Sequence, residues 1–374
     1  MMRARGFSLV ELMVAITLAL IVTAGVMSVF IGSRSAYQST AGVAAVSDSG
    51  RFALNFVEGA VRDAGNMACG APVRTIFNIG PGTPLSAPPL PTLAFQPITG
   101  FEAVGTGMLG GAYNVTATPG AAGNWLSPIG WPGGLDPAFG TLASAPVLNN
   151  DILVVRSTTR GAAPAYVTSA AAGANSFNVV SVPGNYLPGN LAIISDCVKS
   201  LIFQISSITG NTINHTTGGF PGNQTNTFPP QVNFDPGSEV TLLQTTAYYI
   251  GVGADGDGAL FAADLSAGDS FTSAVPPLSP NELVPDVEAM QILYGLDTTG
   301  TRTVGQWVTA DQVPDYSSVM SVHIALLAAG PPASAPLPTL AKTYNLLGVT
   351  VTAPIDTRNR QVFDVTVGVR NLLP

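Results

Sequence analysis

The sequence of 374 residues is long enough to bury a substantial core, yet it is poor in charge. Charged residues make up 10% of it, against about 25% in typical soluble proteins, and the formal net charge is −8. Because the chain is acidic and its only lysines are Lys199 and Lys342, we predict no nucleic-acid partner. The 41 glycines and 30 prolines favour many turns and short strands over long helices.

The amino terminus joins a short basic leader to a long apolar run. Arg3 and Arg5 precede this run, and from Phe7 to Ile31 the only ionisable side chain is Glu11. As a helix, residues 7–31 would measure about 37 Å, enough to cross a hydrocarbon core of about 30 Å. The two arginines predict that the amino end stays in the cytoplasm of a single-pass inner-membrane protein whose remaining residues are periplasmic.

The position of Gly6 is unusual for a secretory signal, whose cleavage site would follow the apolar core. Cleavage after Gly6 would remove the leader at residues 1–6, keep the helix and leave Phe7 as the first residue. The arrangement resembles the class III signal of type IV prepilins and secretion pseudopilins. This resemblance implies cleavage after Gly6 and N-methylation of Phe7, both by a separate prepilin peptidase.

An acid inside an apolar helix is costly in a membrane, so Glu11 is a functional hypothesis in its own right. It lies four residues from the new amino terminus. Its carboxylate could pair with the free ammonium of a neighbouring, staggered subunit and so set the axial step of a filament. The alternative is an acid near the membrane interface that reaches water. With Gly6 and Phe7 beside it, we favour the assembly role.

Residues 32–66 are predicted to continue the same helix as an amphipathic half. Apolar or small residues recur there at spacings of three and four, as expected for one helix face, at Val43, Val46, Gly50, Ala53, Val57, Ala60 and Ala64. Gly65 and Asn66 form a stop signal. A simple anchor with a linker would not need this second stripe, so we expect it to pack on a globular head.

The head, residues 67–374, is predicted to be rich in β-structure. A loop-rich insertion occupies about residues 70–150, with short strands possible at Thr92–Phe95 and Phe101–Val104. Later apolar runs bounded by turn residues predict strands at Asp151–Arg156, Ser176–Val182, Asn190–Asp196, Leu201–Ile208, Val240–Ile250, Ala259–Ala263, Val319–Leu327 and Phe363–Val369. The sequence therefore predicts an α+β fold, in which one long helix packs on a mainly antiparallel sheet.

Cys69 and Cys197 are the two cysteines, and the expected topology places both where disulfides persist. We expect them to form a bridge; two unrelated buried thiols are the alternative. One cysteine pair and two distant histidines predict no metal site, and Asp255–Gly258 fits a hairpin turn better than a calcium loop. His215 and His323 lack a neighbouring nucleophile, so we expect no catalytic triad, no cofactor and no enzymatic activity.

Further segments are similar to the PilW family of minor type IV pilins. They are Gly65 with Cys69, Ser195–Cys197, Leu201–Gln204, Thr246–Tyr249, Leu260-Phe261, Leu283–Glu288, Gln291–Asp297, Trp307–Asp311, Val319–Leu327 and Arg370-Asn371. Where the family often has a basic residue, this chain has Ala328–Gly330. Residues 70–150 and 210–240 look specific to this protein.

The resemblance implies a pilin-like fold and a role in priming pilus assembly, and hence in adhesion, twitching motility or DNA uptake. Its implied partners are other major and minor pilins, prepilin peptidase, the inner-membrane assembly machinery and a tip adhesin. A large head fits a pilus tip more easily than a tightly repeated shaft. Two alternatives stay open: a minor pseudopilin of a type II secretion system, and a membrane-anchored periplasmic enzyme or ligand-binding domain.

Overall fold

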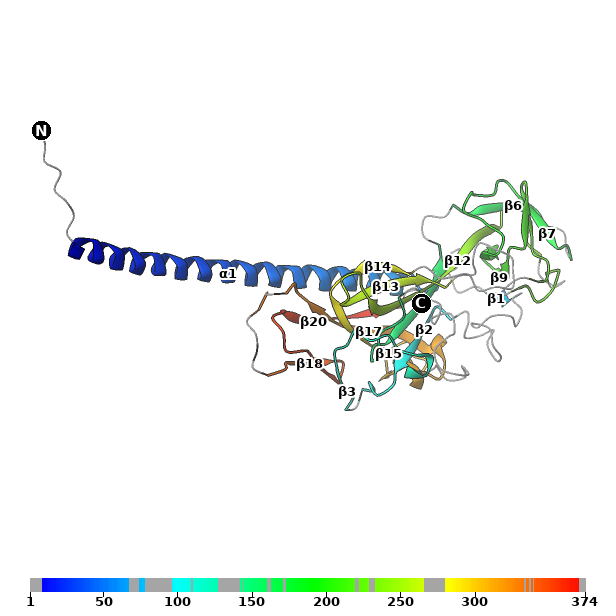
Figure 1. Cartoon of the computed structure of the whole chain (residues 1–374). Helices are drawn as coiled ribbons and strands as arrows, with labels where there is room; N and C mark the ends of the chain where they lie inside the picture. The colour runs from blue at the N-terminus through cyan, green and yellow to red at the C-terminus, as the bar shows by residue number, and fades with distance from the viewer. Residues whose placement is uncertain are drawn as a thin grey trace, which may run out of the picture.

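In the computed structural model the chain is one long helix that runs into a β-rich head (Figure 1). The far end of the head forms a second lobe, on the side opposite the helix tip. The structure describes residues 9–66, 74–77, 96–108, 110–126, 142, 144–159, 163–170, 173–218, 222–228, 233–265, 280–332, 334–335, 338 and 340–369.

Helix α1 spans Leu9–Asp63 without a break. Proline is absent from it, and hydroxyls that would otherwise compete with the backbone bond back to the helix's own carbonyls. Thr17 donates to the Val14 carbonyl at 2.9 Å, and Thr23 donates to Ala19 at 2.7 Å. The helix ends just before Gly65, which has a φ of 74° and so ends it at little conformational cost.

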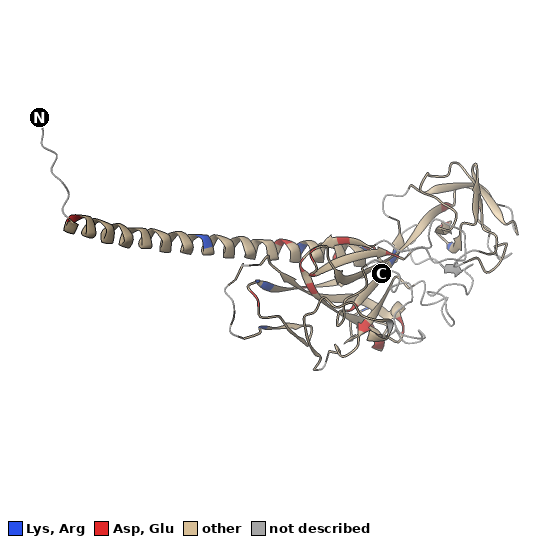
Figure 2. Cartoon of the chain, viewed as in Figure 1, with Lys and Arg blue, Asp and Glu red and all other residues tan. Residues whose placement is uncertain are grey.

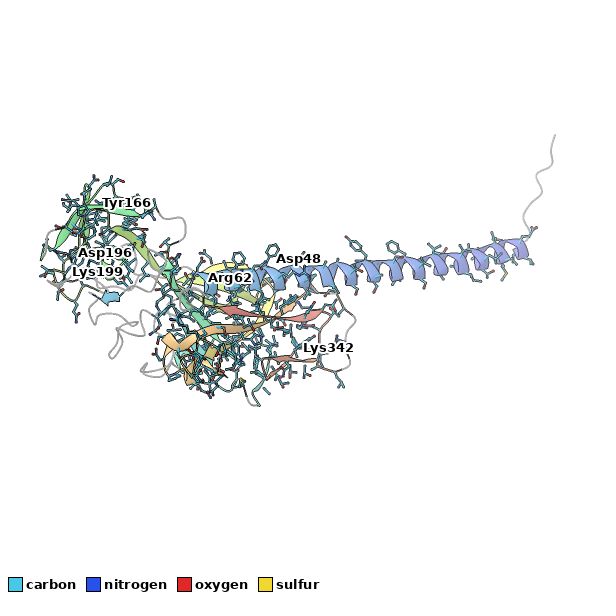
Figure 3. The ribbon with its side chains drawn as sticks, turned by 180° about the vertical axis from the view of Figure 1, so that it is seen from behind. Asp48, Arg62, Tyr166, Asp196, Lys199 and Lys342 are labelled. Atoms are coloured by element: carbon cyan, nitrogen blue, oxygen red, sulfur yellow. The ribbon has the colours of Figure 1, made fainter. Side chains whose placement is uncertain are left out.

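The carboxyl half of α1 packs on the head through a stripe of small and branched side chains. Its buried residues are Gly42, Val46, Gly50, Ala53, Val57, Ala60 and Val61. A Cβ on Gly50 would overlap the Phe363 ring, and one on Gly42 would overlap Ser334. The two glycines therefore let the helix approach the sheet closely. Asp48 and Arg62 lie on the opposite side of the helix (Figure 3).

A four-stranded antiparallel sheet lies under α1. Its order is β16 (Gln306–Val308), β15 (Val287–Leu296), β17 (Val319–Ala329) and β20 (Arg360–Gly368). Every residue of β15 is buried, because α1 and the larger sheet cover one face and a smaller sheet covers the other. That smaller sheet contains β18 (Thr343–Leu346), β19 (Val349–Thr352) and β3 (Ala112–Asn114).

The largest sheet joins the two lobes through one long strand, β12 (Glu239–Val252). Its first half pairs with β8 and β6 of the far lobe, and its second half with β5 and β13 near α1. The other strands are β1 (Arg74–Phe77), β2 (Ile98–Ala103), β4 (Trp125–Leu126), β5 (Ile152–Thr158), β6 (Ala165–Ser169), β7 (Ser176–Val179), β8 (Leu191–Ser195), β9 (Lys199–Gln204), β10 (Ser207–Thr209), β11 (Thr212–Asn214), β13 (Gly258–Asp264) and β14 (Asn281–Val284).

The far lobe, which we call the distal lobe, consists of β6–β11 and the start of β12, and it has its own core. Aromatic rings dominate that core. Phe177, Phe203 and Phe234 surround the stacked pair of His215 and Phe228, whose ring centroids lie 3.8 Å apart. The lobe is therefore a packed unit and not a surface loop.

The predicted fold class is confirmed: a long amino-terminal helix packs on a head whose strand pairs are antiparallel except β1 with β9 and β19 with β3. The β-runs predicted after Asp151 are present as strands, with shifted ends. One detail of the helix stripe is wrong, because Val43 is 52% exposed and Gly42 is buried in its place. The predicted strand at Thr92–Phe95 lies outside the described residues.

Candidate assembly surface

The first half of α1 has no contact with the head. Every described residue from Leu9 to Tyr37 is exposed, and the exposed fractions include 70% at Val29 and 63% at Phe30. Figure 2 shows this stretch as almost free of charge, as the sequence requires. Among the described residues, α1 is the one helix long and apolar enough to cross a membrane. An apolar surface of this size must be covered by lipid or by other protein.

Glu11 lies in the first turn of α1. A carboxylate at this end of a helix interacts favourably with the helix dipole. This first turn lies at the end of α1 that is farthest from the head (Figure 1). Gly6 and Phe7, the residues predicted to be cleaved and methylated, lie outside the described residues, so their roles stay predictions.

A loop of the head that contains Gly330 and Ser334 packs against α1 at the point where the helix leaves the head. Gly42 of the helix approaches Ser334 and Gly330 closely. The Asn359 backbone N–H donates to the Ser334 hydroxyl at 2.9 Å, and the Gly330 N–H donates to the Asn359 carbonyl at 2.7 Å. These bonds hold the segment around Asn359 to the one around Gly330 and Ser334, which lies against Gly42. Gly42 therefore marks the boundary between the exposed and packed halves of the helix.

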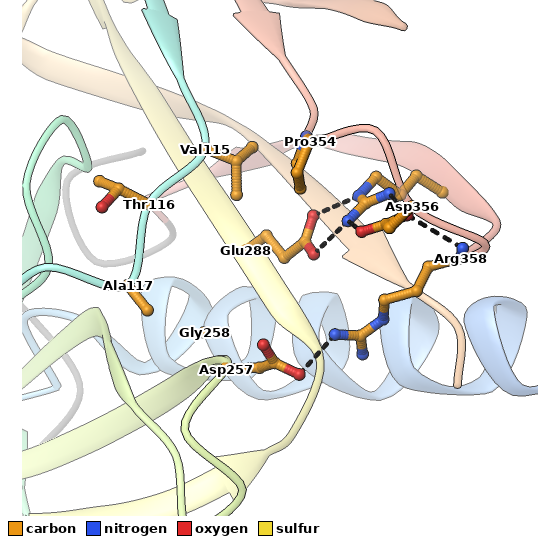
Figure 4. A pocket seen from close by; sticks show the side chains of 10 residues that line it. Val115, Thr116, Ala117, Asp257, Gly258, Glu288, Pro354, Asp356 and Arg358 are labelled. Atoms are coloured by element: carbon orange, nitrogen blue, oxygen red, sulfur yellow. Dashed lines mark hydrogen bonds and ion pairs between the residues drawn. The ribbon is translucent and has the colours of Figure 1, made fainter. Parts of the chain in front are cut away.

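Beside this boundary, Arg358 and Arg360 hold the segment that joins β19 to β20 against neighbouring strands. The residues involved surround a cavity of about 140 Å³ (Figure 4). Arg360, 3% exposed at its side chain, binds Glu288 through two bonds of 2.6 and 2.9 Å and also binds Asp356. Hydrogen bonds from Arg360 keep the pKa of Asp356 below its usual value, against the opposing effect of burial. Arg358 pairs with Asp257 at 2.5 Å and with Asp286.

Asp255, Asp257 and Asp286 could bring oxygens within 4.8 Å of one another. Two of the three carboxylates already pair with Arg358. Asp255 lies in the turn of the predicted hairpin, which is confirmed as the connection between β12 and β13. Paired guanidinium and carboxylate groups of this kind are a structural clamp on the loop.

A second polar cluster is buried where β2 meets β15. The two oxygens of Asp151 accept backbone N–H bonds from Ala103 at 3.0 Å and Ile292 at 2.8 Å. Burial raises the pKa of Asp151 to about 7. Burial, with the negative charges of Asp151 and Asp311, raises the pKa of Glu102 to about 10. Glu102 is therefore neutral at physiological pH. Because Asp151 bonds to the backbone of both β2 and β15, the cluster also holds the large sheet to the four-stranded one.

The histidines occupy structural positions. His215, predicted to lie in a loop, is 1% exposed within the aromatic core of the distal lobe, where burial lowers its pKa to about 4. His323, on β17 as predicted, lies 3.1 Å from Asp364 and beside the Trp307 ring. No serine or cysteine hydrogen bond to either imidazole is present among the described residues.

Cys197 is disulfide-bonded. Cys69, the other cysteine of the sequence, lies outside the described residues. The backbone places the two segments near each other, since β1 and β9 pair in parallel with Arg74 opposite Lys199. The bridge between Cys69 and Cys197 stays a proposal that this register supports.

Sequence reasoning missed three features: the arginine clamp, the buried acid cluster and the separate core of the distal lobe. Only the first left a sequence signal, since Arg358 and Arg360 follow Asp356 in a chain with few charges. The carboxylates that pair with them come from distant strands. Local periodicity does not report such pairings.

Comparisons with known proteins now bear on this arrangement. The profile of the prokaryotic N-terminal methylation motif matches residues 1–27, and that of the type IV pilus-assembly protein W family, PilW, matches residues 247–371. Residues 28–246, including the distal lobe up to β12, lie outside both matches. None of the curated proteins matches the chain.

Among solved structures, a type IV-like pilin from Thermus thermophilus is similar at 21% identity, over 50% of this chain and 86% of that one. The TM-score is 0.23, which is too low to establish a shared fold. The two profile matches cover the exposed start of α1 and the four-stranded sheet that lies under its other half. A prepilin methylation motif and a PilW match in one chain support a minor type IV pilin.

Proposed function

We propose that the chain is cleaved after Gly6, N-methylated at Phe7 and held in the inner membrane by residues 7–31 with its head in the periplasm. It is then incorporated into a type IV pilus, where it helps other major and minor pilins to begin assembly. The observation that carries this proposal is α1 itself. A fully exposed apolar half with one acid at its tip continues directly into a half that is fixed to the head.

We propose a structural role for the head, which the use of its polar groups supports. Its buried charges serve as ties: Arg360 holds Glu288, and Asp151 holds the backbone of two sheets. In a filament, Glu11 would pair with the amino terminus of an adjacent subunit, because both charges need a partner in an apolar core.

We place the head at or near the pilus tip. The distal lobe extends the head on the side away from the exposed helix (Figure 1), and it increases the bulk that a repeating shaft would have to accommodate. Labelled heads imaged along sheared pili test this position. Label confined to ends supports it, and uniform label along the shaft contradicts it.

Deletion of the chain separates pilus assembly from the alternative of a type II secretion pseudopilin. We expect loss of surface pili with exoprotein secretion intact, and restoration of pili by the wild-type chain. Loss of secretion with normal pili would favour the pseudopilin.

A further inference from the structure

Strand β20 forms an open edge of the four-stranded sheet. It pairs with β17 through nine consecutive residues, from Arg360 opposite Ala329 to Gly368 opposite Ser321, without a shift in register. Among the described residues, no strand pairs with its other side. An unpaired strand of this kind presents a row of free backbone donors and acceptors.

The length of β20 sets it apart from the other terminal strands of the three sheets. Those strands, β1, β3, β4, β10, β14, β16 and β18, have between two and four residues each, whereas β20 has nine. Proteins commonly protect an edge by making it short or bulged, or by placing lysine or proline in it. Strand β20 is neither short nor bulged and has no lysine or proline; its charged residues are Arg360, which is paired with Glu288 and Asp356, and Asp364.

The flanking bonds show which backbone groups point outward. The Val369 N–H donates to the Met320 carbonyl at 2.9 Å, and the Asn359 carbonyl accepts from Gly330. In an antiparallel pair, the N–H and C=O of one residue point to the same side, and successive residues alternate. The groups that point away from β17 therefore belong to Arg360, Val362, Asp364, Thr366 and Gly368.

The side chains of β20 are also incompletely covered. Of its nine residues only Val367 is buried, whereas on the neighbouring β17 only His323 is not. Phe363 and Val365 face α1 but remain half-buried, and on the other face the Asp364 side chain is 61% exposed. The edge is thus apolar on the face toward α1, and on the other face its exposed charge is Asp364, which lies 3.1 Å from His323 of β17.

We propose that β20 accepts an extended segment of a different pilus subunit as an additional strand. That segment would carry apolar side chains over Phe363 and Val365 and a lysine or arginine near Asp364. A second copy of this chain, paired symmetrically about Asp364 at the middle of the strand, would place two like charges opposite each other. The inference relies on the proposed function only for the partner being a pilus subunit.

Photocrosslinking in cells that assemble pili tests the inference on the full chain. p-Benzoylphenylalanine would be placed at Gln361, an exposed position of β20, and in a parallel strain at Tyr37, which is 75% exposed on α1. We expect the Gln361 adduct to contain one other pilus subunit, with the crosslinked peptide mapping to an extended, alternating segment. A crosslink to a second copy, or to residues of the same chain, would overturn the proposal.

Backbone variants of Thr366 distinguish strand addition from side-chain contact. Thr366→Pro removes an outward N–H and leaves the β17 ladder intact, whereas Thr366→Val keeps it. We expect Thr366→Pro to reduce the Gln361 crosslink at least tenfold and Thr366→Val to leave it unchanged, with equal thermal unfolding of the purified chains. Thr366→Lys, which keeps the N–H and blunts the edge with charge, should also reduce the crosslink.

Equal crosslinking in all three variants would contradict the proposal. So would the absence of a Gln361 adduct while the Tyr37 crosslink to other pilins persists, a result that leaves the proposed function standing. Loss of both crosslinks together with normal pili would instead refute the proposed function, and this inference with it.

Discussion

The two halves of α1 differ in what covers them, although both are built from small and branched apolar residues. Between Leu9 and Tyr37 every described side chain is exposed. Between Gly42 and Val61, one face is buried on β17 and β20, and the opposite face carries charges such as Asp48 and Arg62. An apolar surface all round indicates an environment without water, whereas an amphipathic one indicates a helix at a protein surface.

This difference indicates that the two halves of the helix pack against different surroundings. One face of its second half is covered by the chain's own head, where glycines allow close packing with Phe363 and Ser334. Its first half leaves its whole surface to a membrane or to other subunits. The boundary at Gly42 is set by loops of the head and not by a change in helix propensity.

The largest expected effect concerns the exposed half. Glu11→Val removes the one charge that a neighbouring amino terminus could pair with, while the helix keeps its length and apolarity. We expect the protein to be stable in the membrane but lost from pili by about 100-fold or more, measured by immunoblotting of sheared filaments. Glu11→Gln serves as the isosteric control and should be lost to a similar extent.

Incorporation of Glu11→Val at the wild-type level would show that the exposed half needs no charge pairing, and would remove the distinction between a filament helix and a simple anchor.

The next effect concerns the packed half. Gly50→Leu would force a side chain into the Phe363 ring, and overpacking of this kind costs about 1–3 kcal/mol. We expect the free energy of unfolding of the detergent-solubilised chain to fall by that amount in urea. Gly25→Leu is the matched control, because nothing lies within 4 Å of a Cβ at Gly25, and it should leave head stability unchanged. An equal loss in both variants would contradict the comparison.

The buried acid cluster between the large sheet and the four-stranded one gives a smaller effect, which depends on pH. The pKa of Glu102 is raised to about 10 in the folded head, so the folded state binds more protons than the unfolded state above about pH 4.5. Stability should therefore decrease as pH rises above 5, by up to about 1.4 kcal/mol between pH 5 and pH 6.

Glu102→Gln imitates the protonated acid. We expect it to cost under about 1 kcal/mol at pH 5 and to flatten the decline at higher pH, measured by urea unfolding at several pH values. Asp151, whose pKa is raised to about 7, contributes a decline of the same sign in both proteins, and because its charge acts on Glu102, the difference between the curves reports the pair of acids. Parallel curves would show that Glu102 is ionised in the folded head.

The smallest effect is expected on the outer face of the packed half. Arg62 pairs with Glu58 one turn earlier, but the Arg62 side chain is 57% exposed. Surface pairs at this spacing contribute about 0.3–0.5 kcal/mol. Arg62→Ala should therefore change stability by no more than that and leave pilus incorporation intact. A loss above about 1 kcal/mol would indicate that this face, too, is covered.

Sequence reasoning predicted the parts of this fold that depend on local pattern. The 3.6-residue period identified the packed stripe of α1, and the alternation over Phe363–Val369 identified β20. The end of the helix was predictable from Gly65, whose positive φ is the expected stop. Val43 was misassigned because the stripe is formed by Gly42, and the period alone cannot distinguish adjacent positions.

The rest depends on contacts between distant residues. Glu288 and Arg360 lie 72 positions apart, and no local signal links them. The distal lobe was read as separate short strands because its core forms only when β6–β11 close around His215 and Phe228. For the candidate assembly surface, the sequence singles out Glu11 because an acid is so rare in an apolar run, and its role stays a prediction; the acidic partners of the clamp and the acid cluster were not predictable.

The most direct test of the central claim is mass spectrometry of the protein recovered from sheared, purified pili. If the exposed half of α1 is a filament helix, the chain will be present and will begin at N-methylated Phe7, with Glu11 as its fifth residue. Recovery of the chain only from membranes, still carrying Met1, would show that this helix is an anchor and would contradict the account.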